Sequence, residues 1–157
     1  IRKLEKARIP LLQLKYKNTK IDVLYCQNTT SEDDPLKFLE NPLLIHKISE
    51  QSLESLNGYL DTEYVFRYIA KENIDKDLFA SLVRCLKYWS KKRGIYGDKY
   101  GYLRGFSWTL MTLHILPQFA KVETSDATPQ GRLLQALRFF FEVYAQWDWK
   151  TNAVSIL

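Results

Sequence analysis

The segment 76–93 places its apolar side chains at helical spacing, and this pattern limits the possible folds more than any other feature of the sequence. Six residues recur every three or four positions and fall on one side of a helix: Leu78, Phe79, Leu82, Val83, Leu86 and Trp89. At about 100° per residue, Lys87 and Lys91 project roughly 120–160° away from that stripe. Because such a helix must bury its apolar side against other elements, we expect it to lie in a helical bundle.

Helix start and stop signals predict two short helices before this segment. Ser49 can cap a helix that ends at Gly58, since serine is favoured at the first position and glycine just past the last one. Asp61 or Thr62 can cap the next helix, which is expected to end near Lys71.

Prolines indicate the remaining helices. Pro35 follows two aspartates and Pro129 follows a threonine, and both positions are typical of a helix start. The nearly all-apolar segment 104–116 predicts a buried helix, which Pro117 is expected to end. The polar segment 121–128 predicts a loop. The helix that begins at Pro129 is rich in aromatic residues, which we expect in the core rather than at a base-stacking surface.

Two apolar runs near the start of the chain predict a β-hairpin. The runs 9–16 and 21–27 are rich in β-branched and other apolar residues, and the polar stretch 17–20 between them is typical of a turn. We therefore predict a mainly α chain, with a strand pair in residues 1–27 and a helical bundle in residues 28–157.

Composition favours an intracellular globular protein with a phosphate-rich partner. Apolar residues make up 46% of the chain, and the net charge of +5 suits a nucleic acid or a nucleotide, although many unrelated proteins are equally basic. Cys26 and Cys85 have no metal-ligand spacing, so we expect reduced thiols. No apolar run approaches the length of a membrane span. The start at Ile1 rather than Met indicates part of a longer protein.

Asp22 is the first candidate for chemistry because it stands in the middle of an apolar strand. With a period of two it shares a strand face with Leu24 and Cys26, and a carboxylate is costly to bury there without compensation. A divalent metal such as Mg²⁺ is one such compensation. The alternative is an aspartate that faces water on an edge strand, and periodicity alone favours this alternative.

The segment 84–108 is the second candidate because it joins basic residues to a glycine-rich stretch. Lys87 and Lys91 stand one helical turn apart and can hold a triphosphate as two point charges. Four glycines follow and allow backbone to approach a ligand closely: Gly94, Gly97, Gly101 and Gly105. A solvated basic helix face followed by an ordinary turn is the alternative, and the charge pattern alone favours it.

Five motifs occur in order along the chain. They are Ala-Arg-Ile-Pro-Leu-Leu-Gln-Leu with Lys-Ile-Asp-Val-Leu-Tyr (7–14 and 20–25), Ser-Leu-Asn-Gly (55–58), the basic helix and its exit (87–96), Gly-Tyr-Leu-Arg-Gly-Phe-Ser-Trp (101–108) and the aromatic ending (139–149). Together they resemble the motifs of eukaryotic-type poly(A) polymerases over nearly the whole chain. The resemblance implies a divergent member, with the last strands of a nucleotidyltransferase palm followed by the helical central domain.

This resemblance implies template-independent transfer of AMP from ATP to RNA 3′ ends. In this family the RNA 3′-hydroxyl attacks the α-phosphate of ATP, assisted by two Mg²⁺ (or Mn²⁺) ions on three aspartates. Asp22 would be the third aspartate and a metal ligand, whereas the motifs that carry the first two are not in this sequence. The chain alone is therefore expected to be inactive, with a catalytic N-terminal part and a C-terminal RNA-binding domain supplied elsewhere. Nuclear residence is implied by the same resemblance.

The resemblance also assigns nucleotide contacts. They are Asn57 near the ribose, Lys87, Lys91 and Tyr96 at the triphosphate, and Asp98, Gly105 and Phe106 near the base. Three positions depart from the family pattern: Asp98 replaces a common Asn that helps to read adenine, Arg104 replaces a Gly, and Phe106 replaces a Val. Two alternatives therefore stay open. One is a related terminal nucleotidyltransferase with another base preference, and the other is a non-catalytic RNA-binding or scaffold module.

Overall fold

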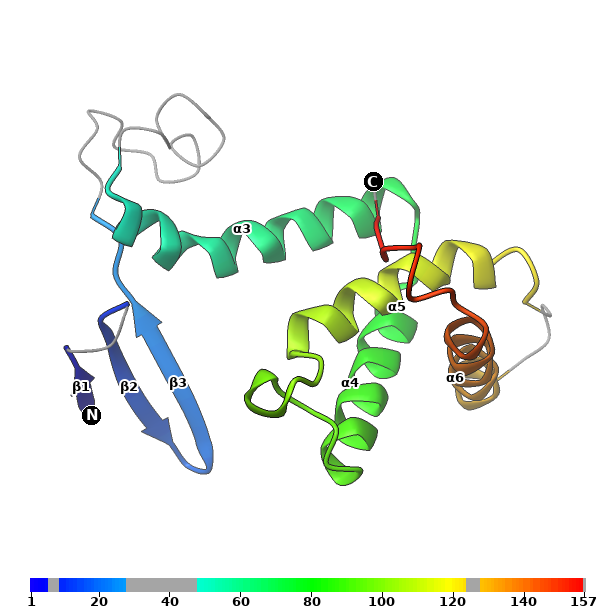
Figure 1. Cartoon of the computed structure of the whole chain (residues 1–157), viewed down its shortest axis with the longest axis horizontal. Helices are drawn as coiled ribbons and strands as arrows, with labels where there is room; N and C mark the ends of the chain where they lie inside the picture. Colours follow the sequence, from blue (N-terminus) through cyan, green and yellow to red (C-terminus); the bar gives the residue numbers. More distant parts are fainter. Residues whose placement is uncertain (6–8, 28–47, 124–127, 157) are drawn as a thin grey trace. The chain divides into compact units, whose positions relative to one another are not determined.

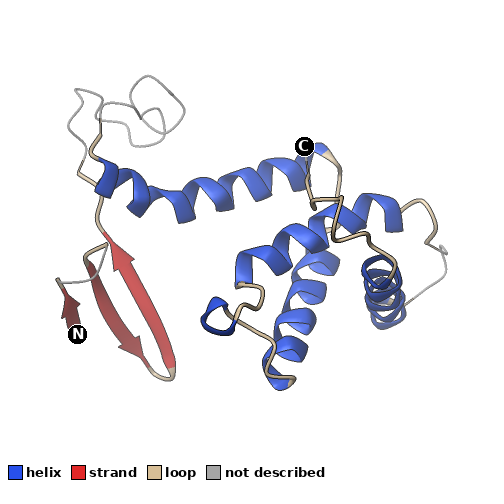
Figure 2. Ribbon diagram, viewed as in Figure 1, coloured by secondary structure: helices blue, strands red, loops and turns tan. Residues whose placement is uncertain are grey.

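The computed structural model describes residues 1–5, 9–27, 48–123 and 128–156 (Figure 1). The chain divides into two compact units, Ile1–Val65 and Phe66–Leu157. Three strands precede four α-helices in the described residues (Figure 2), so the prediction of a mainly α chain with strands at its start is confirmed. The predicted domain boundary after residue 27 stays a prediction. The helix start expected at Pro35 lies outside the described residues.

The first unit contains an antiparallel sheet in the order β1-β2-β3. β1 spans Arg2–Leu4, β2 spans Leu11–Tyr16 and β3 spans Thr19–Leu24. β2 and β3 form the predicted hairpin, but Tyr16 pairs with Thr19, so the turn is two residues long rather than four. Lys17 takes a left-handed conformation with φ of 52°, as tight hairpin turns require. β1 was not predicted because three residues are too few to show an alternating pattern.

A single helix occupies the region where two short helices were predicted. α3 runs through Glu50–Lys71, and Gly58 lies in its interior. An interior glycine costs about 1 kcal/mol relative to alanine, which is too little to end a helix that packs elsewhere. The Thr62 hydroxyl, expected to cap a second helix, instead donates to the Gly58 carbonyl at 2.7 Å within α3. The predicted cap at Ser49 is confirmed, because its hydroxyl accepts the backbone N–H of Ser52 at 3.2 Å.

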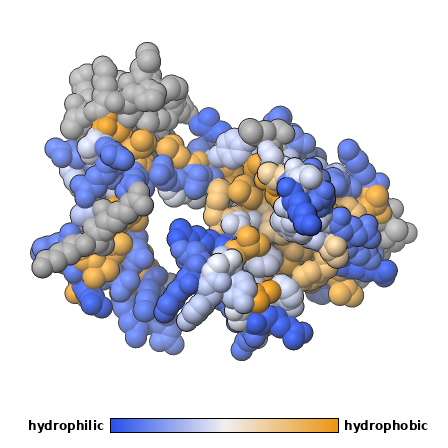
Figure 3. All heavy atoms as spheres, in the orientation of Figure 1, coloured by the Kyte–Doolittle hydropathy of each residue, from blue (hydrophilic) through white to orange (hydrophobic). Residues whose placement is uncertain are grey.

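The second unit is a bundle of α4 (Lys76–Lys92), α5 (Gly105–Phe119) and α6 (Pro129–Ala145). The apolar stripe predicted on α4 is confirmed at its centre by four buried residues: Leu78, Leu82, Val83 and Leu86. The aromatic residues of α6 were predicted in the core. Phe140 and Tyr144 are buried there, whereas Phe141 is 39% exposed. The Tyr144 hydroxyl donates to the Met111 carbonyl at 2.9 Å and so ties α6 to α5, while burial raises the pKa of Tyr144. In Figure 3, apolar residues lie among hydrophilic ones on the visible surface of this unit.

Pro117 lies inside α5, so the prediction that it ends the helix was wrong. An interior proline costs about 3 kcal/mol because it lacks a donor and its ring crowds the preceding turn. The helix nevertheless continues to Phe119, which is only 3% exposed and packs against Phe139 with ring centroids 5.8 Å apart. Burial of such a side chain contributes about 1.5–3 kcal/mol, which offsets most of that cost.

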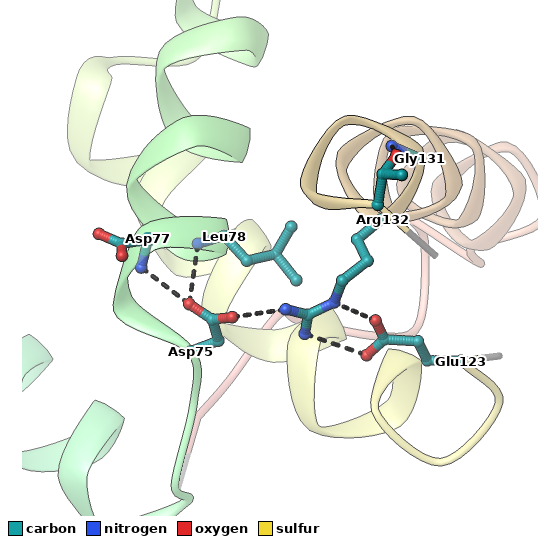
Figure 4. A network of polar contacts seen from close by, with 7 residues as sticks. Asp75, Asp77, Leu78, Glu123, Gly131 and Arg132 are labelled. Carbon is teal, nitrogen blue, oxygen red and sulfur yellow. Dashed lines mark hydrogen bonds and ion pairs between the residues drawn. The ribbon is translucent and has the colours of Figure 1, made fainter. Parts of the chain in front are cut away.

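An ion-pair network closes the bundle at the start of α4 (Figure 4). Asp75 caps α4 by accepting the backbone N–H groups of Asp77 and Leu78 at 2.9 and 3.1 Å. Its other oxygen accepts from Arg132 of α6 at 2.7 Å, and Arg132 also pairs with Glu123. The Leu78 N–H and the Arg132 guanidinium hold the pKa of Asp75 below its ordinary value of 3.8. The network joins the beginnings of α4 and α6 to the chain that follows α5.

Asp75→Asn should remove part of the pH dependence of stability in acid. Because the pKa of Asp75 is lower in the folded state, its charge stabilises the fold above about pH 4, and this contribution is lost as the pH falls through the folded pKa. Asparagine keeps a capping oxygen and loses the charge. Urea unfolding at pH 7, 5, 4 and 3 should show a difference between the two proteins that shrinks toward acid. An equal difference at every pH would contradict the expectation.

Candidate functional site

Lys87, Tyr96 and Gly105 meet where α4 ends and α5 begins. The apolar stripe of α4 faces the core and leaves Lys87 on another side of the helix, where it is half-buried. A Cβ atom built on Gly105 would lie 2.7 Å from the Tyr96 hydroxyl oxygen and 3.6 Å from the Lys87 Nζ. Contacts under 3.0 Å do not occur for real Cβ atoms, so the absence of a side chain at position 105 lets the three groups approach one another.

Lys91 adds a second positive charge to this place. Its Nζ lies 4.8 Å from the centroid of the Tyr96 ring, a cation–π geometry. Burial lowers the pKa of Lys87, and the charge of Lys91 lowers it further. Among the ion pairs of the described residues, none joins a carboxylate to either lysine. Two ammonium groups held together in this way favour an anion.

The N-terminus of α5 contributes backbone donors at the same place. Arg104 occupies the N-cap position with no side-chain hydrogen bond to the helix, and the first turn carries no acidic residue. The first N–H groups of a helix have no intrahelical acceptor, and they lie at the positive end of the helix dipole. Together with Lys87, Lys91 and Tyr96, they form what we call the anion cluster, centred on Gly105.

The loop between α4 and α5 fixes the position of Tyr96. Gly97 has a φ of 101°, which other residues rarely adopt. Its N–H donates to the Leu103 carbonyl at 3.0 Å, and its carbonyl accepts the Tyr102 N–H at 3.1 Å, so the loop closes on itself. A short 3₁₀ helix, η1 (Asp98–Tyr100), lies within this closed loop. The glycine-rich stretch thus brings the tyrosine back toward α4.

Asp98 forms an ion pair with Arg104 across the same loop. Both side chains are exposed, and the pairing reduces the repulsion that an isolated Asp98 would exert on a phosphate. Sequence reasoning treated the two residues as separate departures from the family pattern and missed the pair. The signal was present, because two unusual residues of opposite charge stand six positions apart on either side of a turn.

The two compact units divide the predicted site residues between them. The second unit holds Lys87, Lys91, Tyr96 and Gly105 of the anion cluster, together with Asp98 nearby in the loop and Phe106 in the first turn of α5, where its ring is partly exposed. Asn57 lies exposed on α3 in the first unit. Asp22 also belongs to the first unit. The contacts expected for these residues with a nucleotide stay predictions.

A family model described as "Poly(A) polymerase central domain" matches residues 78–156. The match includes most of α4, all of α5 and α6, and the anion cluster. The chain belongs to the poly(A) polymerase family. The resemblance inferred from the five motifs is therefore confirmed, as is the helical fold that it implied.

Several poly(A) polymerases are similar to this chain over almost its whole length. Nuclear poly(A) polymerase 1 of Arabidopsis thaliana is 30% identical over 94% of this chain and 19% of its own length. Nuclear poly(A) polymerase 2 of the same plant is 28% identical over 91% of this chain and 16% of its own length. The poly(A) polymerase of Entamoeba histolytica is 27% identical over 99% of this chain and 28% of its own length. The chain thus spans less than a third of these poly(A) polymerases.

Asp22 lies in the β-sheet that precedes the poly(A) polymerase central domain. Within the described sheet β3 is an edge strand, and its Asp22 side chain is exposed. Gln13, its partner across the pair, donates to one carboxylate oxygen at 3.0 Å. This exposed aspartate on an edge strand is the alternative that the periodicity favoured, and the role of Asp22 as a metal ligand stays a prediction. A solvent-facing carboxylate still suits a hard cation such as Mg²⁺, although the described residues contain no group of three or more potential ligands.

The helices of the described residues include none that is long and apolar enough to cross a lipid bilayer.

Proposed function

We propose that this chain is the nucleotide-binding segment of a template-independent poly(A) polymerase that adds AMP from ATP to RNA 3′ ends. The observation that carries the proposal is the anion cluster, in which Lys87, Lys91 and Tyr96 converge on an uncapped helix N-terminus around Gly105. A triphosphate is the anion that such a set of donors suits best, because several oxygens need partners at once.

The anion cluster would bind the β- and γ-phosphates and orient the α-phosphate. In the transfer the RNA 3′-hydroxyl loses its proton to solvent, and a bond forms between its oxygen and the α-phosphorus. The bond from that phosphorus to the oxygen that bridges the α- and β-phosphates breaks. Negative charge then grows on the leaving pyrophosphate, where Lys87 and Lys91 would stabilise it. Mg²⁺ (or Mn²⁺) would neutralise phosphate oxygens, with Asp22 as one carboxylate ligand.

Other parts of a longer protein would complete the enzyme. The similar poly(A) polymerases are about three and a half to six times as long as the segment that matches, which supports the proposal that two more catalytic aspartates and an RNA-binding domain lie outside this chain. By itself the chain would then bind a nucleotide without extending RNA. Two of these relatives are named nuclear enzymes, which supports a nuclear location for this protein as part of the proposal.

A second candidate is a related terminal nucleotidyltransferase with another base preference. The Asp98–Arg104 ion pair favours it, because a carboxylate accepts hydrogen bonds and cannot supply the amide donor of the usual Asn. Binding of ATP, UTP, CTP and GTP, each with Mg²⁺, distinguishes the two functions. Tighter binding of ATP than of the other three supports the adenylyltransferase, and equal or reversed affinities support the second candidate.

Lys87→Gln tests the proposal directly. A hydrogen bond to a charged group contributes about 1.5–3 kcal/mol, so the variant should bind Mg-ATP about tenfold more weakly or worse in calorimetric titrations. Lys121→Gln removes the same charge from an exposed site after α5 and should bind as the unchanged chain does. Equal affinities for all three proteins would contradict the proposal. RNA binding without any nucleotide response would instead favour a non-catalytic RNA-binding or scaffold module.

A further inference from the structure

The positive charge of the chain is concentrated in one short stretch. Residues 84–104 contain seven basic residues and one acidic residue, a formal charge of +6. The rest of the chain contains 16 basic and 17 acidic residues, a formal charge of −1. The single acid of the stretch, Asp98, is already paired with Arg104. The net positive charge of the chain therefore comes from α4 and the loop that follows it. This stretch has more positive charges than the two lysines of the anion cluster.

Three residues of this stretch form an exposed row along α4 beside the anion cluster. Arg84, Tyr88 and Lys92 follow one another at intervals of four, so they lie on one side of the helix over about 12 Å. At 100° per residue this row is the neighbour of the one that carries Lys87 and Lys91. We call Arg84, Tyr88 and Lys92 the outer row.

Tyr88 makes the outer row more than a patch of charge. Its ring is 65% exposed, although a tyrosine in a bundle usually buries its ring. The Lys92 Nζ lies 5.4 Å from the ring centroid, a cation–π geometry. Arg84, one turn before it, donates only to the Ser81 hydroxyl among the described hydrogen bonds, at 3.2 Å. Both cations remain available to phosphate, and the ring lies between them.

We propose that the outer row binds single-stranded RNA, as a contact separate from the anion cluster. Arg84 and Lys92 would each contact a backbone phosphate, and an unpaired base would stack on the Tyr88 ring. An acidic peptide would satisfy the two cations equally well but would leave the ring unused. The proposal goes beyond the nucleotide-binding function and does not depend on the anion cluster binding a triphosphate.

The test is the binding of a fluorescent single-stranded oligo(A) by the whole 157-residue chain at several salt concentrations. Removing two phosphate contacts with Arg84→Gln/Lys92→Gln should make the slope of log affinity against log salt shallower by about 1.4. Tyr88→Leu should weaken binding about fivefold or more, whereas Tyr88→Phe keeps a ring and should bind nearly as tightly as the unchanged chain. Lys121→Gln/Lys150→Gln removes the same charge from exposed sites outside α4 and should leave the slope unchanged.

Several results would overturn the proposal. One is an unchanged salt slope in the Arg84/Lys92 variant, and another is a Lys121/Lys150 control whose slope falls as much as that of the Arg84/Lys92 variant. The others are an RNA duplex that binds as tightly as the single-stranded oligo(A), or polyglutamate that displaces labelled oligo(A) as well as unlabelled oligo(A) does. Mg-ATP titrations of the same variants distinguish a failure of the RNA-binding proposal from a failure of the proposed nucleotide-binding function. The outer-row variants should still bind nucleotide. In the Lys87→Gln background, Tyr88→Leu should still weaken the binding of oligo(A). Binding of ATP without binding of oligo(A) would support the proposed function and contradict the RNA-binding proposal.

Discussion

Gly105→Ala should weaken Mg-ATP binding about tenfold or more while leaving the chain as stable as before or slightly more so. The added methyl would lie 2.7 Å from the Tyr96 hydroxyl, so the hydroxyl must move away from position 105 at the helix N-terminus. Alanine is also the better helix former by about 1 kcal/mol, so the fold itself loses nothing. Calorimetric titration with Mg-ATP and urea unfolding of the same sample measure the two effects separately.

A second substitution shows whether the loss arises from that contact. Tyr96→Phe removes the hydroxyl that the methyl would meet, and it also removes a proposed phosphate donor. Gly105→Ala should therefore cost much less affinity in the Tyr96→Phe background than in the unchanged chain. If the loss is the same in both backgrounds, the hydroxyl is not the group displaced, and our description of the anion cluster is wrong.

Phe140→Ala should lower the free energy of unfolding of the helical unit by about 3–5 kcal/mol. Phe140 is 1% exposed, and its ring lies between α6 and its neighbours, 4.8 Å from the ring of Tyr144 and 6.3 Å from that of Trp108. Small domains are stable by only about 5–15 kcal/mol, so this loss is a large part of the total. Urea unfolding followed by tryptophan fluorescence measures it.

The next residue provides a matched control. Phe141 has the same side chain on the same helix, but 39% of it is exposed, so Phe141→Ala should cost less than half as much. Similar losses for both variants would show that the ring of Phe140 is not the centre of the core.

The sequence was most informative where one helix carries a clear two-sided pattern. The stripe from Leu78 to Leu86 identified α4 within a residue of each end, because such a pattern depends only on the helix itself. It was least informative at Gly58 and Pro117, which were expected to end helices. The glycine penalty is weak, and the larger proline penalty is mostly offset by long-range packing such as that of Phe119. Packing partners distant in sequence are not visible in a local pattern.

The site shows the same division. Lys87, Lys91, Tyr96 and Gly105 were singled out from their spacing and from the family motifs, and the fold brings these four together. The Asp98–Arg104 pair escaped notice because it depends on how the loop closes through Gly97. For Asp22, periodicity favoured an exposed aspartate on an edge strand, and the described sheet agrees with this. All six residues of β3 are exposed, so the expected alternation between two strand faces does not appear in their burial.

The cap at Asp75 also has a consequence for the lysines at the other end of α4. A helix resists twisting, so a rotation of its first turn about the helix axis also rotates Lys87, about 18 Å further along. Arg132 and Glu123 hold that first turn against α6 and the end of α5. The direction in which Lys87 points is therefore determined in part by residues that never approach it. Substitutions at Asp75, Glu123 or Arg132 would therefore change the affinity for a phosphate without altering any group that contacts it.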